Sequence, residues 1–369
     1  MHRRNILTVM ILLAASAAGA GTPDVPEYYP DDYDRIIEAS KQEDGILIYG
    51  NIAEYNWRYI IEGFQAKYPW IKKVQSLDLG PAVSFERYYA ERSIGEHTAD
   101  LLAVGSPEGF HRFARSGAME PYASPETPHL PDWSYDGAGL YTLSTDPMVI
   151  IYNKLAMPES DWPDSLEDIR ELARTQPDRY RDRVTTYDAT KHSFAYDIHW
   201  NVAKRAGAGA DALFRELGSI TRPESGAATM AEKVTSGEYL AGYFVSGIGV
   251  FPRMSEPGRS KILGWSLIRD GTPTFLRGMA LTRDGNNPNS AKLLLDYILS
   301  HEGQVAVGKG GLTPYRPDVS EEEIPYFSYQ ELIRELGKEN IVLIDYDAKS
   351  SPGREAFLRR WKQAFRIAN

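Results

Sequence analysis

The chain has 369 residues, of which 42% are hydrophobic and 25% are charged, and its formal net charge is −10. This length and composition favour a globular protein with two lobes, and the acidic balance excludes a general attraction to nucleic acid or to anionic membranes. The absence of cysteine excludes disulfides, thiolate catalysis, thiolate metal sites and lipid attachment through a cysteine.

The first twenty residues have the features of a secretory signal peptide. Two arginines at positions 3 and 4 precede the apolar run ILTVMILLAASAA, and the small residues AGA follow it. A basic start, a short apolar stretch and a small-residue end are typical of a cleaved signal, and the run is shorter than the roughly 20 residues that span a bilayer. We therefore expect residues 1–20 to be removed near Ala20, leaving a soluble periplasmic protein.

The next part of the chain alternates between strand and helix patterns. Residues 21–34 are rich in Pro, Asp and Tyr and predict an extended arm. Compact apolar runs then predict strands at 45–51, 72–79 and 99–106, and amphipathic spacing predicts helices at 54–69, 83–96 and 107–117. Strict alternation of this kind indicates an α/β fold with a mostly parallel, helix-covered sheet.

A second unit follows the apolar stretch at 145–158. Helices are predicted at 165–175, 193–207 and 229–238, a strand at 183–189, and two extended runs within 262–282 around a Gly-Thr-Pro turn. A single long helix is predicted over 289–311, capped by Asn289 or Ser290. The chain is expected to end with a strand at 340–346 and a helix over 351–365, with Ser351 at the cap and Pro352 at its first position.

Sequence motifs of catalysis and of cofactor binding are missing. VGSPEG (104–109) does not match the nucleophile elbow, and GKGGLT (308–313) follows a helix where a dinucleotide loop follows a strand. The seven histidines are scattered and form no metal-binding pair. We expect no catalytic residue, no resident metal and no cofactor, so the chain is not expected to be an enzyme. A secreted hydrolase that uses two carboxylates stays open, because no pair of acids stands out.

Six stretches, taken in order, resemble one family. They are IIEASKQEDGILIYGN (36–51), FQAKYPWIK (64–72), TADLLAVGS (98–106), MVIIYNKLAMP (148–158), NPNSAKLLLDYILSHEGQ (287–304) and GGLTPYRPDV (310–319). Together they resemble the solute-binding proteins of ABC transporters, in the branch that includes the binding proteins for ferric iron, organophosphates and phosphonates. Trp70 stands where this family usually has glycine.

The resemblance implies a two-lobed type 2 periplasmic-binding-protein fold. Each lobe would be a mostly parallel sheet covered by helices, and two hinge crossovers would connect the lobes. We expect lobe 1 to comprise 35–145 and 276–317, and lobe 2 to comprise 146–275 and 318–369. The implied function is capture of a small solute by hinge closure for ABC permease subunits in the inner membrane, by a monomer. Delivery of the liganded protein to a membrane receptor kinase is the alternative.

Polar residues at the predicted strand ends form the candidate binding site. Ligands of open α/β sheets lie beyond the carboxyl ends of strands, near helix N-termini whose free N–H groups attract anions. The candidate ligand-binding residues are Asn51, Glu54, Ser106, Thr145, Asp146, Asp188, Thr190, Ser193, Tyr243, Ser246 and Arg277. For several of them a structural role is an equal alternative, as helix caps for Ser106 and Ser193 and as a salt bridge between lobes for Arg277.

The stretch GEYLAGYFVSGIGVF (237–251) bears on the nature of the ligand. Ferric-iron-binding relatives carry two adjacent tyrosines here, because phenolate oxygen is a hard donor suited to a hard cation. In this chain Tyr239 and Tyr243 are separated, and Tyr243 is favoured as a residue of the strand core. We therefore expect a strand followed by a ligand-facing loop, and an organic anion (organophosphate, phosphonate or carboxylate) as the ligand. Ferric iron and an apolar solute stay as alternatives.

Overall fold

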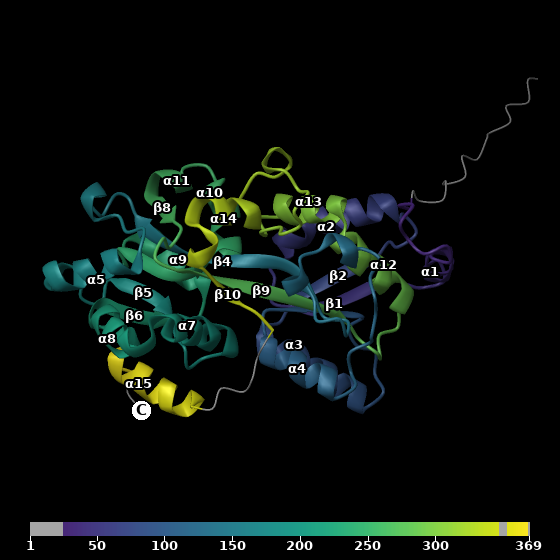
Figure 1. Ribbon diagram of the computed structural model, residues 1–369, viewed down its shortest axis with the longest axis horizontal. Helices are drawn as coiled ribbons and strands as arrows, with labels where there is room; N and C mark the ends of the chain where they lie inside the picture. Colours follow the sequence, from purple (N-terminus) through teal and green to yellow (C-terminus); the bar gives the residue numbers. More distant parts are fainter. Residues whose placement is uncertain (1–24, 347–352, 368–369) are drawn as a thin grey trace, which may run out of the picture.

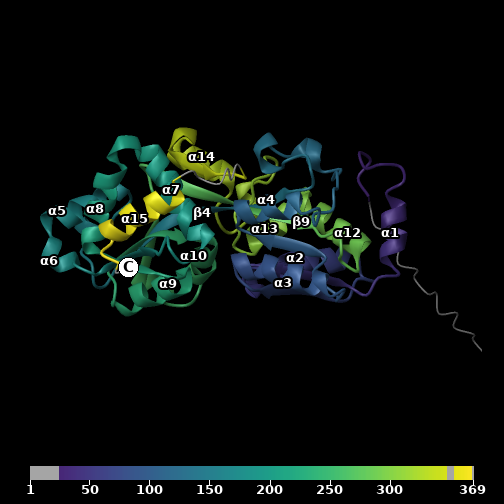
Figure 2. The same ribbon diagram turned by 90° about the horizontal axis from the view of Figure 1, so that it is seen from below.

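The computed structural model describes residues 25–346 and 353–367. The predicted signal peptide, Ser351 and Pro352 lie outside the described residues. Two halves lie side by side, and the long strands β4 (Tyr141–Asn153) and β9 (Thr272–Leu281) run through the middle and connect them (Figures 1 and 2). All residues of both strands are buried, as expected for strands covered on both faces. The predicted two-lobed α/β fold is confirmed.

The strands are parallel within each half and antiparallel where the halves meet. β1 (Ile46–Gly50) pairs in parallel with β2 (Val74–Asp78) and β3 (Leu101–Val104). In the second half β5 (Val184–Tyr187) pairs in parallel with β6 (Thr221–Glu224) and β7 (Ala241–Ser246). The order is β2-β1-β3-β9-β4-β7-β5-β6, with β8 (Leu263–Ser266) on β4 and β10 (Ile341–Ile344) on β9. β4 and β9 are therefore the two crossovers.

Helices cover both faces of the sheet in the first half. Ile46 and Ile48 of β1 pack in one hydrophobic cluster with α2 (Glu54–Lys67) and α12 (Pro288–Leu299), whereas Tyr49 packs in another with α3 (Pro81–Ser93) and α4 (Pro107–Arg115). This division follows from the two-residue period of a strand, which sends neighbouring side chains to opposite faces. α1 (Asp34–Ser40) and α13 (His301–Lys309) complete this half.

The second half has a single large hydrophobic cluster around β4, β5 and β7. Its helices are α5 (Leu166–Thr175), α6 (Pro177–Tyr180), α7 (Ser193–Ala206), α8 (Ala210–Ile220), α9 (Ala227–Ser236), α10 (Gly247–Met254), α11 (Arg259–Ile262) and α15 (Arg354–Ala364). α14 (Tyr329–Leu336) follows the segment at 318–328. Short 3-10 helices lie at Thr127–His129, Asp132–Ser134, Glu159–Asp161, Gly207–Gly209, Glu321–Glu323 and Lys338–Asn340. Among the described residues, no helix is long and apolar enough to cross a membrane.

Two local predictions are wrong. The single helix expected over 289–311 breaks at Ser300, whose extended backbone ends α12 and whose hydroxyl accepts the N–H of Gly303 to begin α13. The cap of α12 is neither Asn289 nor Ser290. Instead, the carboxylate of Glu43 accepts the backbone N–H groups of both residues, at 3.0 and 2.7 Å. A capping group 246 positions earlier in the chain is beyond the reach of local patterns.

The N-terminal arm is fixed by phenol hydroxyls. Tyr28 and Tyr29 both donate to the fully buried carboxylate of Glu126, which also pairs with Arg316 of the GGLTPYRPDV motif. The arginine of that motif therefore has a structural role, because it neutralises a buried acid.

A second buried carboxylate lies close by. Asp296 on α12 is fully buried and accepts hydrogen bonds from the hydroxyls of Tyr33, Tyr122 and Ser124, at 2.6–2.7 Å. Burial raises the pKa of Asp296 to about 7 in spite of these three donors. In the folded chain the carboxyl group of Asp296 therefore keeps its proton up to about pH 7, whereas in the unfolded chain it releases this proton near pH 4.

This difference predicts a pH dependence of stability. Since the folded pKa of Asp296 lies above its unfolded value, its contribution to stability is complete below about pH 4 and is lost as the pH rises through about 7, a change of about 4 kcal/mol. The Asp296→Asn variant should show a flatter dependence of the free energy of unfolding between pH 4 and 7, measured by urea titration. Asp211→Asn, at an exposed position, should keep the wild-type slope. Equal slopes in D296N and the wild type would contradict this assignment.

Candidate ligand-binding site

Four strand-to-helix turns and the two crossovers meet between the halves. β1 leads to α2, β3 to α4, β5 to α7 and β7 to α10, while β4 and β9 pass between them. The predicted site residues lie on these turns and crossovers, with the exception of Tyr243, which lies within β7. The carboxyl ends of parallel strands together with helix N-termini are where open α/β sheets hold ligands.

Arg277 of β9 and Asp146 of β4 form a buried ion pair at this junction. The side chains are 4% and 0% exposed, and Nε and Nη2 of Arg277 donate to Oδ2 of Asp146 at 3.1 and 2.7 Å. Nη1 donates to the backbone oxygen of Asn51 at 3.1 Å, and the guanidinium lies 5.4 Å from the ring centre of Phe194. Three of the five guanidinium N–H groups are thus engaged by the protein itself.

The carboxylate of Asp146 also organises the start of α10. It accepts the hydroxyl of Ser246 at 2.8 and 3.0 Å and the backbone N–H of Ile248 at 3.4 Å. A carboxylate at a helix N-terminus is stabilised by the helix dipole, so Asp146 acts as the cap of a helix from another element. The ligand-facing loop that the sequence predicted after β7 is wrong, because residues 247–254 form the helix α10.

The N-termini of α4 and α7 face each other across the two halves. The hydroxyl oxygens of Ser106 and Ser193 are 3.5 Å apart. Ser106 is the cap of α4, since its hydroxyl accepts the N–H of Gly109. Ser193 is not the cap of α7, because His192 fills that role by accepting the N–H of Ala195 through Nδ1. The hydroxyl of Ser193 is therefore not used for capping.

Two of the predicted residues are engaged in a local turn. Oδ1 of Asp188 accepts both the backbone N–H and the hydroxyl of Thr190, at 2.8 and 2.6 Å. Such a turn satisfies the short polar groups before a helix. Asp188 is 7% exposed. These two side chains shape the approach to α7 and are less free to bind a solute than Ser193.

The remaining polar residues differ in their access to the junction. The side-chain oxygen of Asn51 accepts the N–H of Gly105 at 2.9 Å, which ties the β1–α2 turn to the β3–α4 turn. Glu54 is exposed in the first turn of α2. Thr145 is fully buried, and its hydroxyl donates to the carbonyl of Thr313 at 3.1 Å.

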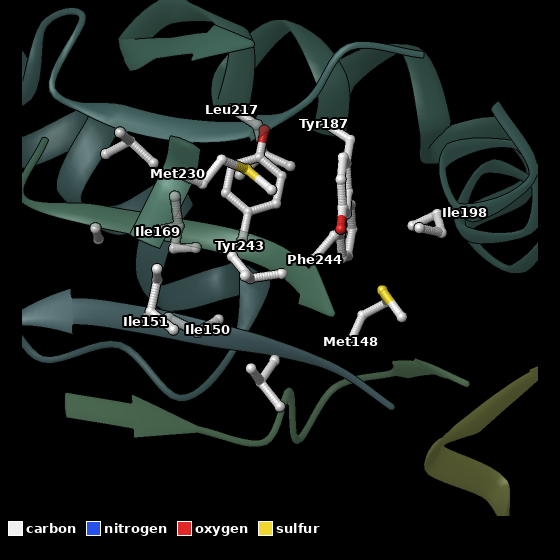
Figure 3. Close-up of a cluster of buried hydrophobic side chains, with 14 of the residues drawn as sticks. Met148, Ile150, Ile151, Ile169, Tyr187, Ile198, Leu217, Met230, Tyr243 and Phe244 are labelled. Carbon is white, nitrogen blue, oxygen red and sulfur yellow. The ribbon is translucent and has the colours of Figure 1, made fainter. Parts of the chain in front are cut away.

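Tyr243 lies in the hydrophobic core of the second half. Figure 3 shows its ring among Leu217, Met230 and Ile169. Its hydroxyl is 3.4 Å from that of Thr221, and burial raises the pKa of the phenol above its ordinary value. The side chain is completely buried and packs within this core, so the structure gives Tyr243 the strand-core role that the sequence favoured.

A β-bulge explains how two neighbouring aromatic residues enter the same core. The register between β4 and β7 shifts between Val149 and Ile151, and Phe244 has a φ of 59°. The rings of Tyr243 and Phe244 are 5.0 Å apart, although successive residues of a regular strand point to opposite faces.

The sequence interpretation missed Tyr55, Asp78 and Arg253. Tyr55 is 46% exposed on α2 and lies within electrostatic reach of Arg253, Asp78, Arg277 and Asp146. Partial burial raises the pKa of Asp78 above its ordinary value, and Arg277 opposes this effect. Asp78 ends β2, so the strand-end rule that selected the other residues identifies it as well. The positions of Tyr55 and Arg253, within helices, carry no such signal.

Comparisons with known proteins place the chain in a family. A family profile of bacterial extracellular solute-binding proteins matches residues 94–329, which is more than half of the chain. The chain belongs to this family. It is therefore an extracellular solute-binding protein by family, and the family places it in the periplasm or outside the cell. A comparison with curated proteins returned no match.

Solved structures of several binding proteins have the same fold as this chain. The substrate-binding protein of an ABC transporter from Agrobacterium tumefaciens is 18% identical, with a TM-score of 0.76 over 88% of this chain and 96% of the other. AfuA from Actinobacillus pleuropneumoniae, with fructose-6-phosphate bound, is 20% identical, with a TM-score of 0.67 over 88% and 99%. Iron-bound HitA from Pseudomonas aeruginosa is 16% identical, with a TM-score of 0.64 over 87% and 99%. At these identities the likeness shows the fold.

The buried ion pair generates a stability prediction. Removing one partner leaves an uncompensated buried charge, so Asp146→Asn and Arg277→Met should each lower the free energy of unfolding by about 3–5 kcal/mol. The double variant should lose less than the sum of the two, measured by urea titration of all four proteins. Arg269→Met, which breaks the exposed pair with Asp164, should cost at most about 1 kcal/mol. Additive losses at Asp146 and Arg277 would show that the two side chains are not coupled.

Proposed function

We propose that the chain captures a small organic anion between its two halves and presents it to an ABC importer. The observation that carries the proposal is the meeting of the α4 and α7 N-termini, where Ser106 and Ser193 lie 3.5 Å apart on opposite halves. Each helix start directs backbone N–H groups and a positive dipole end toward the same place. An anion held there would contact both halves at once, so its binding would favour closure.

The charges at the junction suit an anion of low total charge. Arg277 is largely neutralised by Asp146, but by donor count it keeps two N–H groups for a ligand oxygen. Arg253 lies within electrostatic reach of Tyr55, as Arg277 does. A phosphate, phosphonate or carboxylate would thus be held by hydrogen bonds from backbone and hydroxyl groups. The fructose-6-phosphate in AfuA is consistent with a ligand of this class.

The tyrosines of the 237–251 segment support the preference for an organic anion over ferric iron. Tyr239 donates its hydroxyl to Glu224 at 2.5 Å, and Tyr243 is buried in the core. Burial raises both phenol pKa values, which disfavours the phenolate that a ferric ion requires.

The lobe boundaries belong to the same proposal. We propose that 35–145 with 276–317 and 146–275 with 318–369 move as two bodies about β4 and β9. Separate hydrophobic clusters in the two halves support this division. Residues 318–336 pack against both clusters, through Tyr329 and Leu332 on one side and Tyr326 on the other, so this segment lies next to the hinge. We further propose that the mature chain begins near residue 21 and acts as a monomer.

Affinity measurements test the proposed ligand class. We expect the mature chain to bind fructose 6-phosphate, methylphosphonate or lactate, and to bind neutral fructose much more weakly, in calorimetric titrations. Ser193→Ala should weaken binding of the anion about tenfold or more, because a hydrogen bond to a charged group is lost. Ser160→Ala, at an exposed position of the same half, is the matched control. Equal binding of neutral and anionic sugars would refute the proposal.

A spectroscopic titration tests the exclusion of iron. Addition of ferric ion should produce no visible phenolate-to-iron absorption band, with an iron-binding relative as the positive control. Tyr55 is the exposed tyrosine near Arg277 and Asp146, so any band should be examined in Tyr55→Phe as well as in Tyr243→Phe. A strong band that either substitution abolishes would show that the chain binds ferric iron.

A further inference from the structure

The C-terminal segment makes further contacts between the halves. β10 pairs in parallel with β9 of the crossover. Tyr346 then binds the first half: its hydroxyl is 2.7 Å from Oγ1 of Thr142, and its carbonyl is 2.5 Å from Nε2 of His111 on α4. α15 returns to the second half, where Phe357 and Trp361 enter the hydrophobic core. The start of α15 thus lies near α4 and α7.

Arg354, the first residue of α15, contacts both of these helices. Its Nη1 donates to the carboxylate of Glu108 in the first turn of α4 at 2.9 Å. Its guanidinium also lies 4.5 Å from the ring centre of Tyr196 on α7. Arg354 belongs to the second half and Glu108 to the first, so this ion pair joins the halves beside Ser106 and Ser193.

A second acidic side chain, Asp197, lies within electrostatic reach of Arg354. Asp197 lies one helical turn after Ser193 on α7, is largely buried, and its Oδ2 has no hydrogen-bond partner within the described part of the chain. The charged groups that act on it are Arg354 from α15 and Glu108 from α4, and burial raises its pKa to about 7. Arg354 lowers the pKa of Asp197 and Glu108 raises it, so loss of Arg354 would leave Asp197 protonated at neutral pH and would leave Glu108 without its partner from the second half.

We propose that Arg354 is a positioning residue that holds the N-terminus of α4 against that of α7. It pairs with Glu108 on α4 and lies over the ring of Tyr196 on α7, and thereby sets the balance between the open and closed arrangements. The inference rests on the proposed function only in taking the α4–α7 junction as the binding site, since Arg354 need not touch the ligand. Exposed ion pairs shift an equilibrium by about two- to fivefold.

A distance measurement without ligand tests the proposal. Because the chain has no cysteine, nitroxide labels can be placed uniquely at Glu62→Cys on α2 and Glu232→Cys on α9, both exposed positions. Pulsed electron paramagnetic resonance of the full mature chain should show a larger population of long distances in Arg354→Gln than in the wild type, by at least about twofold. Arg359→Gln, at an exposed position of the same helix, should leave the distribution unchanged.

Two further variants separate positioning from a general loss of structure. The exchanged pair Arg354→Glu with Glu108→Arg should restore the wild-type distances, and Glu108→Gln should open the halves as far as Arg354→Gln does. Unchanged distances in Arg354→Gln, or failure of the exchanged pair to restore the wild-type distances, would overturn the proposal. Since no ligand is used, the outcome is independent of the calorimetric test: anion binding can fail while Arg354 controls the opening, and the reverse also holds.

Discussion

The pair between Asp146 and Arg277 is the interaction on which the arrangement of the two halves depends. Two charges buried at 0% and 4% exposure are costly unless each is fully compensated. The compensation comes from both halves: Asn51 offers its carbonyl from the β1–α2 turn, and Ser246 and Ile248 donate from the start of α10. The pair lies on the two crossovers themselves, so the hinge is fixed by electrostatics as well as by strand pairing.

The same pair sets the chemistry that is left for a solute. An unpaired arginine would hold an anion with a strong local charge and release it slowly. In this chain Asp146 removes most of that charge, so the proposed anion would meet mainly backbone N–H groups and the hydroxyl of Ser193. The proposed role in an importer would need reversible capture, because the solute would be passed on to membrane subunits. Hydrogen bonds from helix N-termini suit this requirement, since they recognise an anion without a full opposing charge.

Periodicity predicted most of the fold, and local rules predicted only part of the site. The alternating patterns correctly predicted the strands β1 to β3 and the helices α2 to α4, because each pattern depends only on residues that are neighbours in the sequence. The break at Ser300 and the cap from Glu43 were missed, since the first depends on one backbone angle and the second on a distant residue. Asp146 and Arg277 were each selected from the sequence, but their contact joins residues 131 positions apart. The bulge at Phe244 likewise depends on the register with β4, which no pattern in β7 reveals.

The contacts between the halves differ in strength in a way that suits a hinge. The inner pair is buried, and breaking it would cost several kcal/mol, so it should persist in every arrangement of the halves. The outer contacts are weaker: Ser106 and Ser193 are 3.5 Å apart, and Arg354 and Glu108 are 40% and 57% exposed. Their loss costs little more than thermal energy, and water can replace them. Opening should therefore pivot about Asp146 and Arg277 while the contacts of α4 with α7 and α15 separate. A solute bound between α4 and α7 would bridge the two halves in place of these contacts.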